Sequence, residues 1–419
     1  MSPSKEVIKA LPKVELHSHL HGNIRQSTLQ SLLEEKKKTR PVLQGVSFAP
    51  FEILDSRDLD KCFSYFDTVY KVVDDAESVE KITREVLQDY AAENVKYLEL
   101  RTTPRECLTT GLSKEKYCDI VVSVIQELSP SLGMTVRLIL SINRAKHGGE
   151  QAESLAEAAV KEIEVLSRRH PGVVVGVDIA GNPQQGDVTA LLSVLQRRGL
   201  CGSGSGAGLK LTVHTGEVEA AEEVDAILNS GPARLGHACC MSDEQRRKVI
   251  EGGFHVEFCP SSNFFTMRMK SMQDHHVSDF VQDGLRNLSF NCDDTGLFRT
   301  DLTSELFSVG QAFGLSDDDL FLLQKVAVKA AFPPVSSKAD TEKGRECESL
   351  LEAFSNEAFE KAAGRPLAYG GEEPECSPAF WESIRQSFAN PPKEGETARP
   401  QHHIPSPEGN GETEPYVAG

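Results

Sequence analysis

The sequence lacks the features that would place the protein in or across a membrane. Apolar runs such as Val173-Val174-Val175 are far shorter than the ~20 apolar residues that a spanning helix needs. The opening stretch MSPSKEVIKALPKVEL contains no apolar segment of the kind that directs secretion. We therefore expect a cytosolic protein without a membrane partner.

An excess of positive charge is lacking too, and so are paired cysteines. The 419 residues carry a formal net charge of -18, and nucleic-acid affinity depends mainly on Lys and Arg that neutralise phosphates. No nucleic-acid partner is therefore expected, and any phosphate recognition must be local. The ten cysteines are scattered without the spacing of a zinc ribbon, which favours reduced thiols.

What the sequence does contain is a regular alternation. Short runs rich in β-branched residues are separated by longer stretches of helical periodicity. This alternation predicts parallel strands with crossover helices, and eight such units favour a closed (β/α)8 TIM barrel over an open sheet. The expected strands are residues 14–20, 97–103, 136–143, 173–181, 210–217, 234–238, 255–263 and 288–294. The expected helices between them are residues 76–94, 113–128, 150–168, 187–198, 218–229 and 242–251.

An insert of residues 23–75 separates the first two strands. Two of its pieces, 25–37 and 58–73, have helical periodicity. Because the functional loops of such barrels follow the carboxyl ends of strands, we expect this insert to form a helical lid at the mouth. A helix packed on the side of the barrel is the alternative.

The chain continues well beyond the last strand. C-terminal helices are expected at 316–332, with Ser316 as N-cap, and at 346–363. Residues 1–365 are expected to form one barrel domain. Residues 366–419 are expected to be a largely disordered extension, since Pro, Gly, Glu and His dominate beyond about residue 390.

Three histidines alternate along the first strand, at His17, His19 and His21. Side chains two apart on a strand point the same way, and neutral imidazole is the commonest metal ligand. Polar residues at a strand end are the alternative interpretation of this pattern taken alone.

The carboxyl ends of the other strands add further reactive side chains. In a barrel these ends meet at one rim and supply the active site. They offer Thr102, Thr103, Arg105, Asn143, Asp178, Gly181, His214, Glu217, His237, Asp293 and Asp294. Five of the twelve histidines thus fall at strand ends, which chance placement would rarely produce.

Three imidazoles and one carboxylate suit a single divalent transition metal, most of all zinc. Zinc lowers the pKa of a bound water to ~7, so that hydroxide is available at neutral pH. His237 could take or orient its proton, and Glu217 could act nearby as an acid or base. Taken alone, His237 could be a buried strand histidine, and Asp293-Asp294 a capped turn. The expected ligands are His17, His19, His214 and Asp293.

The stretch from about residue 11 to residue 334 resembles the adenosine deaminase family of metal-dependent hydrolases. The matching motifs are PKVELHSHLHG at 12–22, HTGE at 214–217, RLGH at 234–237, SSN at 261–263 and NCDD at 291–294. The resemblance implies a zinc-containing (β/α)8 barrel with the four ligands given above. It further implies that Glu217 protonates purine N1, His237 orients the zinc hydroxide, Asp294 bonds N7 and the backbone of Gly181 meets N3.

Two departures from nucleoside-specific members point to a nucleotide substrate. Those members have an Asp in place of His21, and an Asp would repel a 5′-phosphate to which a His can donate. The second strand ends in Thr102-Thr103-Pro104-Arg105, whose hydroxyls and guanidinium are good phosphate donors, although Arg105 could simply lie in a surface loop.

Both changes resemble the adenosine deaminase-like branch of the family, which deaminates N6-methyl-AMP to IMP. By analogy, Tyr70 on the lid and Asn143 should touch the nucleotide, as should His19 and Asp293. Members of the branch carry His and Asp at the positions of Tyr70 and Asn143, which leaves the phosphate and ribose contacts open.

Four other functions are the alternatives to this one. Deamination of free adenosine to inosine would use the same chemistry. A two-metal amidohydrolase usually has a bridging Lys at a mid-barrel strand end, and the fourth strand end, DIAGN at 178–182, has none. A cytidine-deaminase site needs Pro-Cys-x-x-Cys, which is absent. A purely binding role is disfavoured because every ligand, acid and base type is retained. The oligomeric state expected at the level of the family is a monomer.

Overall fold

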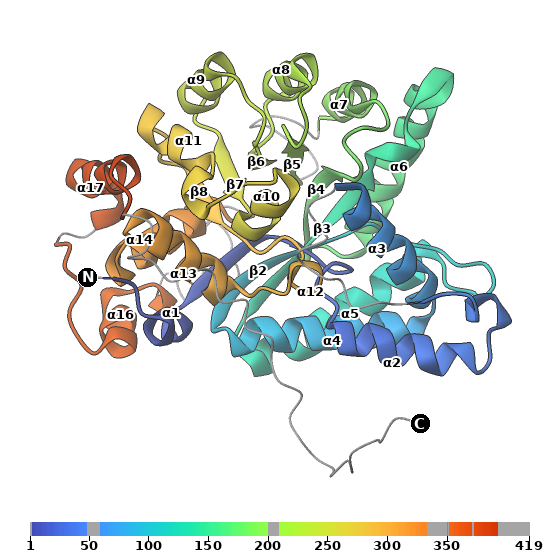
Figure 1. Cartoon of the computed structure of the whole chain (residues 1–419). Helices are drawn as coiled ribbons and strands as arrows, with labels where there is room; N and C mark the ends of the chain where they lie inside the picture. The colour runs from blue at the N-terminus through green and yellow to red at the C-terminus, as the bar shows by residue number, and fades with distance from the viewer. Residues whose placement is uncertain are drawn as a thin grey trace, which may run out of the picture.

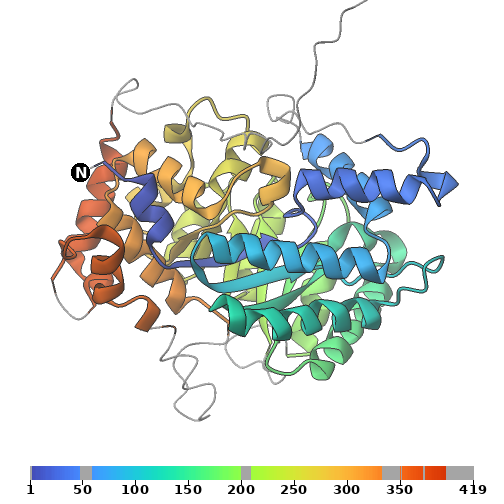
Figure 2. The ribbon, with the colours of Figure 1, turned by 90° about the horizontal axis from the view of Figure 1, so that it is seen from below.

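The eight strands form one parallel sheet in sequential order. The computed structural model describes residues 2–47, 59–199, 209–332, 350, 352–370 and 373–392. Helices surround the strands on the outside, as Figure 1 and Figure 2 show from two directions. The strands are β1 (Lys13–His19), β2 (Val95–Thr102), β3 (Thr135–Asn143), β4 (Val174–Ala180), β5 (Lys210–Thr215), β6 (Arg234–His237), β7 (His255–Phe258) and β8 (Leu288–Phe290).

The ring is closed by the segment that follows β8. The amide of Asp293 donates to the carbonyl of His17 at 2.9 Å, and the amide of His19 donates to the carbonyl of Asp293 at 3.0 Å. The predicted (β/α)8 barrel is confirmed, and its closure brings the ends of β1 and β8 together.

The crossover helices begin where the sequence supplies caps. Asp75 and Ser242 each form a capping box, in which the side chain accepts from the third helical amide. Six helices lie close to their predicted positions: α4 (Ala76–Ala92), α5 (Lys114–Leu132), α6 (Ala152–Arg169), α7 (Val188–Arg197), α8 (Ala221–Ser230) and α9 (Asp243–Glu251). Among the described helices, none combines the length and apolarity needed to cross a membrane.

The insert after β1 divides between the two expected positions. Helix α3 (Leu59–Val72) supplies Phe66 and Tyr70 to the wall of a cavity at the mouth, so the lid prediction is confirmed for this helix. Helix α2 (Gln26–Lys37) packs beside α4, where Arg25 Nε donates to Asp89 at 2.9 Å (Figure 1).

Two strands are shorter than predicted. The strand expected at 255–263 ends at Phe258, and helix α10 (Pro260–Thr266) follows directly. Pro260 explains the change, because proline has no amide to donate to a sheet and suits the first turn of a helix. The last strand ends at Phe290, so the Asp293-Asp294 pair lies in the turn beyond it.

The C-terminal part adds helices that the periodicity did not resolve. Helix α14 (Asp317–Lys329) is confirmed, with Ser316 as its cap, and α16 (Asn356–Ala363) covers the second half of the predicted 346–363 helix. Residues 333–349 lie outside the described residues. The sequence did not predict α1 (Lys5–Ala10), α11 (Val277–Asp283), α12 (Thr295–Phe298), α13 (Leu302–Phe313) or α17 (Pro378–Ala389).

Helix α17 (Pro378–Ala389) lies beyond residue 365, where the barrel domain is expected to end. It lies within the extension predicted to be largely disordered, yet Phe380, Ile384 and Phe388 are buried and Phe388 stacks on Phe313 at 4.2 Å. The overall composition of 366–419 masks this one amphipathic segment, which begins at Pro378. Packing therefore continues at least to α17, and residues 393–419 lie outside the described part of the chain.

Candidate active site

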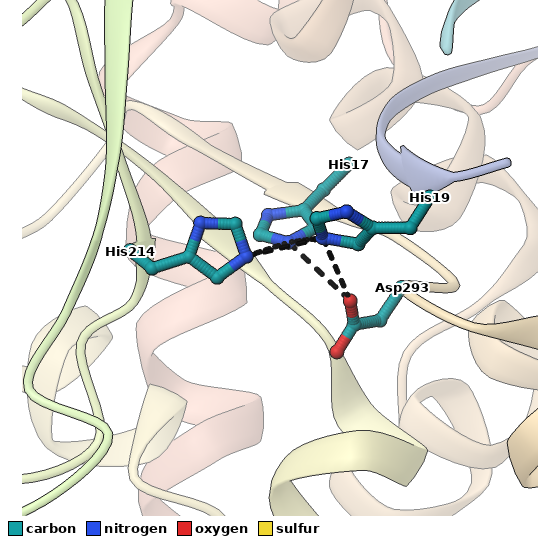
Figure 3. Close-up of side chains that lie close together, drawn as sticks. All are labelled: His17, His19, His214 and Asp293. Carbon is teal, nitrogen blue, oxygen red and sulfur yellow. Dashed lines mark hydrogen bonds and ion pairs between the residues drawn. The ribbon is translucent and has the colours of Figure 1, made fainter. Parts of the chain in front are cut away.

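Four side chains converge at the mouth of the barrel from β1, β5 and the turn after β8 (Figure 3). The Nε2 atoms of the three imidazoles lie 3.1 to 3.3 Å from one another. Asp293 Oδ1 lies 3.4 Å from Nε2 of both His17 and His19. Donors of a tetrahedral ion with bonds of ~2.0–2.2 Å are roughly 3.3–3.5 Å apart. The structure thus brings the predicted ligands together at a spacing that suits one tetrahedral ion: His17, His19, His214 and Asp293.

Two buried carboxylates determine which nitrogens of the ligands are free. Glu257 Oε2 lies 2.8 Å from Nδ1 of His17, and Asp178 Oδ1 lies 3.0 Å from Nδ1 of His214. An ionised carboxylate only accepts, so each Nδ1 carries the proton and each Nε2 presents a lone pair to the centre. Converging lone pairs repel one another unless a cation lies between them, so this donor set fits zinc.

Glu257 belongs to an ionic network inside the barrel. Arg101 and Arg234 both donate to its carboxylate, and Arg234 also donates to Glu99. Burial alone would raise the pKa of Glu257, but the two guanidinium groups hold it well below its ordinary value. Inside the barrel, Arg101 also lies 3.5 Å from Oδ1 of Asp178, so the two guanidinium groups are paired with Glu99, Asp178 and Glu257.

Two glycines of the sequence motifs are required by close packing. A Cβ added to Gly236 would lie 2.8 Å from Cε1 of His17, and one added to Gly22 would lie 1.6 Å from Oδ1 of Asp294. Any side chain at these positions would displace a residue of the site. The glycines in RLGH and HLHG therefore serve the geometry of their neighbours.

His237 enters the cavity from a strained backbone. Its φ is +64°, and φ of Ala238 is +55°, a region that costs a non-glycine residue of order 1–3 kcal/mol. Asn263 Oδ1 accepts from the amide of Cys259 at 3.2 Å, so its Nδ2 donates to Nδ1 of His237 at 3.0 Å. His237 therefore carries its proton on Nε2, which lies 3.9 Å from Oδ2 of Asp293 and 4.0 Å from Oε1 of Glu217.

Glu217 lies in the turn after β5, three residues beyond His214. Burial disfavours its charged form and raises the pKa of its carboxyl to about 7. A carboxyl group with this pKa can hold a proton at neutral pH and give it up to a bound molecule.

A cavity of about 440 Å³ opens beside the four converging side chains. Most predicted substrate contacts line it: His19, His21, Tyr70, Thr102, Thr103, Asn143, Gly181, Asp293 and Asp294, together with Glu217 and His237. Pro104 and Arg105 are not in the wall itself. The guanidinium of Arg105 lies over the ring of Tyr70, 3.7 Å from its centroid, and so stands directly behind the lining.

The polar atoms of the wall that have no hydrogen-bond partner among the described residues include His21 Nε2 and Asp294 Oδ1. Burial lowers the pKa of His21 to about 3, so its ring is neutral between Tyr70 and Tyr117. Burial and the adjacent charge of Asp293 raise the pKa of Asp294 well above its ordinary value, which favours the protonated carboxyl, a hydrogen-bond donor. Both atoms are available to a bound molecule.

Sequence reasoning missed the residues that support the ligands from below. Arg101 and Glu257 lie inside β2 and β7 and are fully buried. A charged side chain within an apolar strand is itself a signal, because such a group is almost never buried without a partner. The cavity wall also contains Ser262, which lies within the SSN motif, and Cys239 and Phe298, which follow the RLGH and NCDD motifs in sequence.

An eight-stranded barrel with histidine and carboxylate donors converging at the carboxyl ends of its strands defines the class of metal-dependent barrel hydrolases. The adenosine deaminase family matches residues 12–343, so the chain belongs to this family and is a hydrolytic deaminase.

Similar proteins cover most of the chain. The N6-mAMP deaminase of Arabidopsis thaliana is 35% identical over 352 residues, which are 78% of this chain and 94% of that protein. The N6-Methyl-AMP deaminase of Danio rerio is 33% identical over 343 residues, 80% of this chain and 94% of that protein. A crystal structure of arabidopsis ADAL complexed with IMP superposes with a TM-score of 0.71 at 34% identity, covering 83% of this chain and 98% of the other.

Proposed function

We propose that the protein is a zinc-dependent deaminase of N6-substituted purine nucleoside 5′-monophosphates, which converts N6-methyl-AMP and water to IMP and methylamine. The observation that carries this proposal is the wall of the cavity near His21. This wall presents a neutral imidazole with an unpartnered Nε2, and a guanidinium stands behind it at Tyr70. The similar N6-methyl-AMP deaminases, and the similar structure with IMP, support the same substrate class.

The phosphate is expected at the side of the cavity formed by β2 and α3. Thr102 Oγ1 is already bonded to the hydroxyl of Tyr117 at 2.5 Å, which leaves Thr103 as the hydroxyl donor. Arg105 reaches the phosphate by leaving the ring of Tyr70, and a guanidinium binds phosphate oxygens with two parallel hydrogen bonds. His21 donates through Nε2 if the ring holds its proton there.

The purine is held in part by two carboxyl groups, Glu217 and Asp294, whose pKa is raised by burial. Glu217 donates a proton to N1, which makes C6 electrophilic, and the protonated carboxyl of Asp294 donates to N7. The backbone of Gly181 lines the cavity, with φ of +105°, and meets N3.

Zinc, when held by His17, His19, His214 and Asp293, supplies the Lewis acidity that makes water nucleophilic at neutral pH. His237 orients the attacking oxygen by donating from Nε2, because its Nδ1 is occupied by Asn263. The water oxygen first adds to C6, and the C6–N6 bond then breaks to release the amine. One water proton replaces the proton that Glu217 gave to N1 and the other leaves on the amine, so in net terms the two protons of water end on N1 and on the departing amine.

We also propose one zinc per chain, a monomer and a cytosolic location. The cysteines that the structure describes are free thiols, as in a reducing compartment. Metal analysis that returned two ions per chain would favour a two-metal amidohydrolase instead.

The test is a comparison of kcat/KM on adenosine, AMP, N6-methyladenosine and N6-methyl-AMP, monitored by amine release and by formation of inosine or IMP. The proposal expects N6-methyl-AMP to be the best substrate. A preference for adenosine would replace it with the alternative, conversion of adenosine to inosine.

A second arm tests the phosphate subsite through Arg105→Gln. Loss of a charge-assisted hydrogen bond of about 1.5–3 kcal/mol should lower kcat/KM on N6-methyl-AMP roughly 10- to 100-fold. Activity on N6-methyladenosine, which has no phosphate, should change little. An equal loss on both substrates would show that Arg105 supports Tyr70 and does not bind phosphate.

A further inference from the structure

The backbone at the end of β6 is held in a conformation that its residues would not adopt on their own. His237 and Ala238 both have positive φ, although neither is glycine. On one side, the amide of Ala238 donates to the carbonyl of Thr215 at 3.0 Å, and the amide of Cys240 donates to the carbonyl of Gly216 at 2.6 Å. These bonds fix the chain after His237 but leave the carbonyl of His237 itself to another partner.

That partner is the side chain of His276. Its Nε2 lies 2.8 Å from the carbonyl oxygen of His237, and since a carbonyl only accepts, Nε2 carries the proton and donates. Nδ1 of the same ring is buried and has no partner among the described residues. Burial lowers the pKa of His276 to about 4, so the ring is neutral at pH 7.

The ring of His276 is fixed by packing on several sides. It stacks on His275, with centroids 4.4 Å apart and planes at 21°, and it contacts Phe258 at 5.3 Å and Phe280 at 6.3 Å. Helix α11, which follows directly, is tied in turn to α17, where Ser278 Oγ donates to the carbonyl of Phe388 at 3.4 Å. The donor therefore lies in a turn that is packed against β7 and α11.

We propose that His276 is a positioning residue for His237. Its hydrogen bond to the His237 carbonyl holds the left-handed backbone that aims the His237 imidazole at Asp293 and Glu217. This inference rests on the proposed function, because it takes His237 to be the residue that orients the attacking oxygen. His276 itself touches neither the cavity nor the ligands, so removing its donor should weaken the chemical step and leave substrate binding intact.

Two substitutions separate positioning from packing. His276→Phe keeps a ring against His275 and Phe258 but removes the donor. His276→Gln removes the ring but can place a donor nitrogen near the position of Nε2. Positioning predicts that kcat on N6-methyl-AMP falls about 10- to 100-fold in the Phe variant with KM little changed, and that the Gln variant recovers most of the loss. A purely structural role predicts the reverse order, with Phe better than Gln in both Tm and kcat.

Three measurements on the full-length protein complete the test. Zinc content and the Kd of IMP should match the wild type in both variants, which shows that the site is assembled. An active Phe variant with normal kcat would overturn the inference. His237→Ala is assayed in parallel. If His237→Ala keeps full activity, the proposed role of His237 fails as well. If His237→Ala loses activity while His276→Phe is normal, only the role of His276 is refuted.

Discussion

Two carboxyl groups in the cavity owe their protonation to burial. Glu217 and Asp294 would be ionised in water at neutral pH, but the site raises the pKa of both. Asp294 also lies next to the charge of Asp293, which adds repulsion to the effect of burial. At the scale of single residues, environment thus turns two ordinary acids into hydrogen-bond or proton donors.

Glu217→Gln should abolish most of the activity without emptying the site. The amide keeps the shape of the side chain but cannot transfer a proton to N1, so kcat should fall by ~10²- to 10⁴-fold. Steady-state assays give the rate, and elemental analysis should still find one zinc per chain. A variant within tenfold of the wild type would assign the proton to another group.

Gly22→Ala should disable the site through Asp294. The new Cβ would overlap Oδ1 of Asp294, 1.6 Å away, and must push that carboxyl out of the cavity. We expect a loss of kcat/KM of at least tenfold, as for loss of a hydrogen bond from a buried carboxyl. Gly45→Ala is the matched control, because nothing lies within 4 Å of its added Cβ. Equal activity of the two variants would contradict the role given to Asp294.

At the scale of elements, α10 and α13 are joined by one buried acid. Glu305 in α13 accepts from the amide of Ser261 at 2.9 Å and from the hydroxyl of Thr300. Burial raises the pKa of Glu305 by more than these two donors lower it, so that the pKa is about 7. The helix that follows the SSN motif is therefore attached through a group whose charge depends on pH.

This attachment predicts a pH-dependent stability. Since the folded state binds the proton of Glu305 more tightly than the unfolded state, the free energy of unfolding should fall as pH rises from about 4.5 to about 7 and stay low above it. The loss attributable to Glu305 is about 3 kcal/mol. In Glu305→Gln this contribution is absent. Urea unfolding should therefore show that the free energy of unfolding of the variant, relative to that of the wild type, is higher at pH 8 than at pH 5. If the free energies of unfolding of variant and wild type differ by the same amount at both pH values, Glu305 is not the cause of the pH dependence.

At the scale of the whole molecule, the metal site and the fold stabilise each other. The ligands His17, His19, His214 and Asp293 come from β1, β5 and the turn after β8, so an ion held by all four would join distant parts of the chain. An ion that binds the folded state more tightly than the unfolded state stabilises the fold by mass action, by about 4 kcal/mol at a thousand times its Kd.

Chelation should therefore lower Tm by several degrees, and added zinc should restore it. The control is His17→Ala, which lacks one ligand and should show little response to either treatment. Differential scanning calorimetry with and without chelator makes the comparison. An unchanged Tm in the wild type would argue against a metal bound at these residues.

The eight-unit alternation and the motifs were enough to predict the barrel and the converging ligands, because strand and helix periods are local properties of the chain. His17 and His19 share a face through spacing alone, and the rim follows from parallel strands. The ends of β7 and β8 were predicted poorly. Pro260 begins a helix directly after β7, and Asp293, which was expected in the last strand, has a φ of +62° and so lies outside the extended conformation.

Only the tertiary structure decided how these residues act. The pairing of His17 with Glu257 joins residues 240 positions apart, and the protonation of Glu217 depends on burial by many segments at once. The bond from His276 to His237 likewise depends on where α11 packs. Local pattern can specify which side chains reach the rim, whereas desolvation and long-range contacts, which no short window of sequence contains, set their charge and orientation.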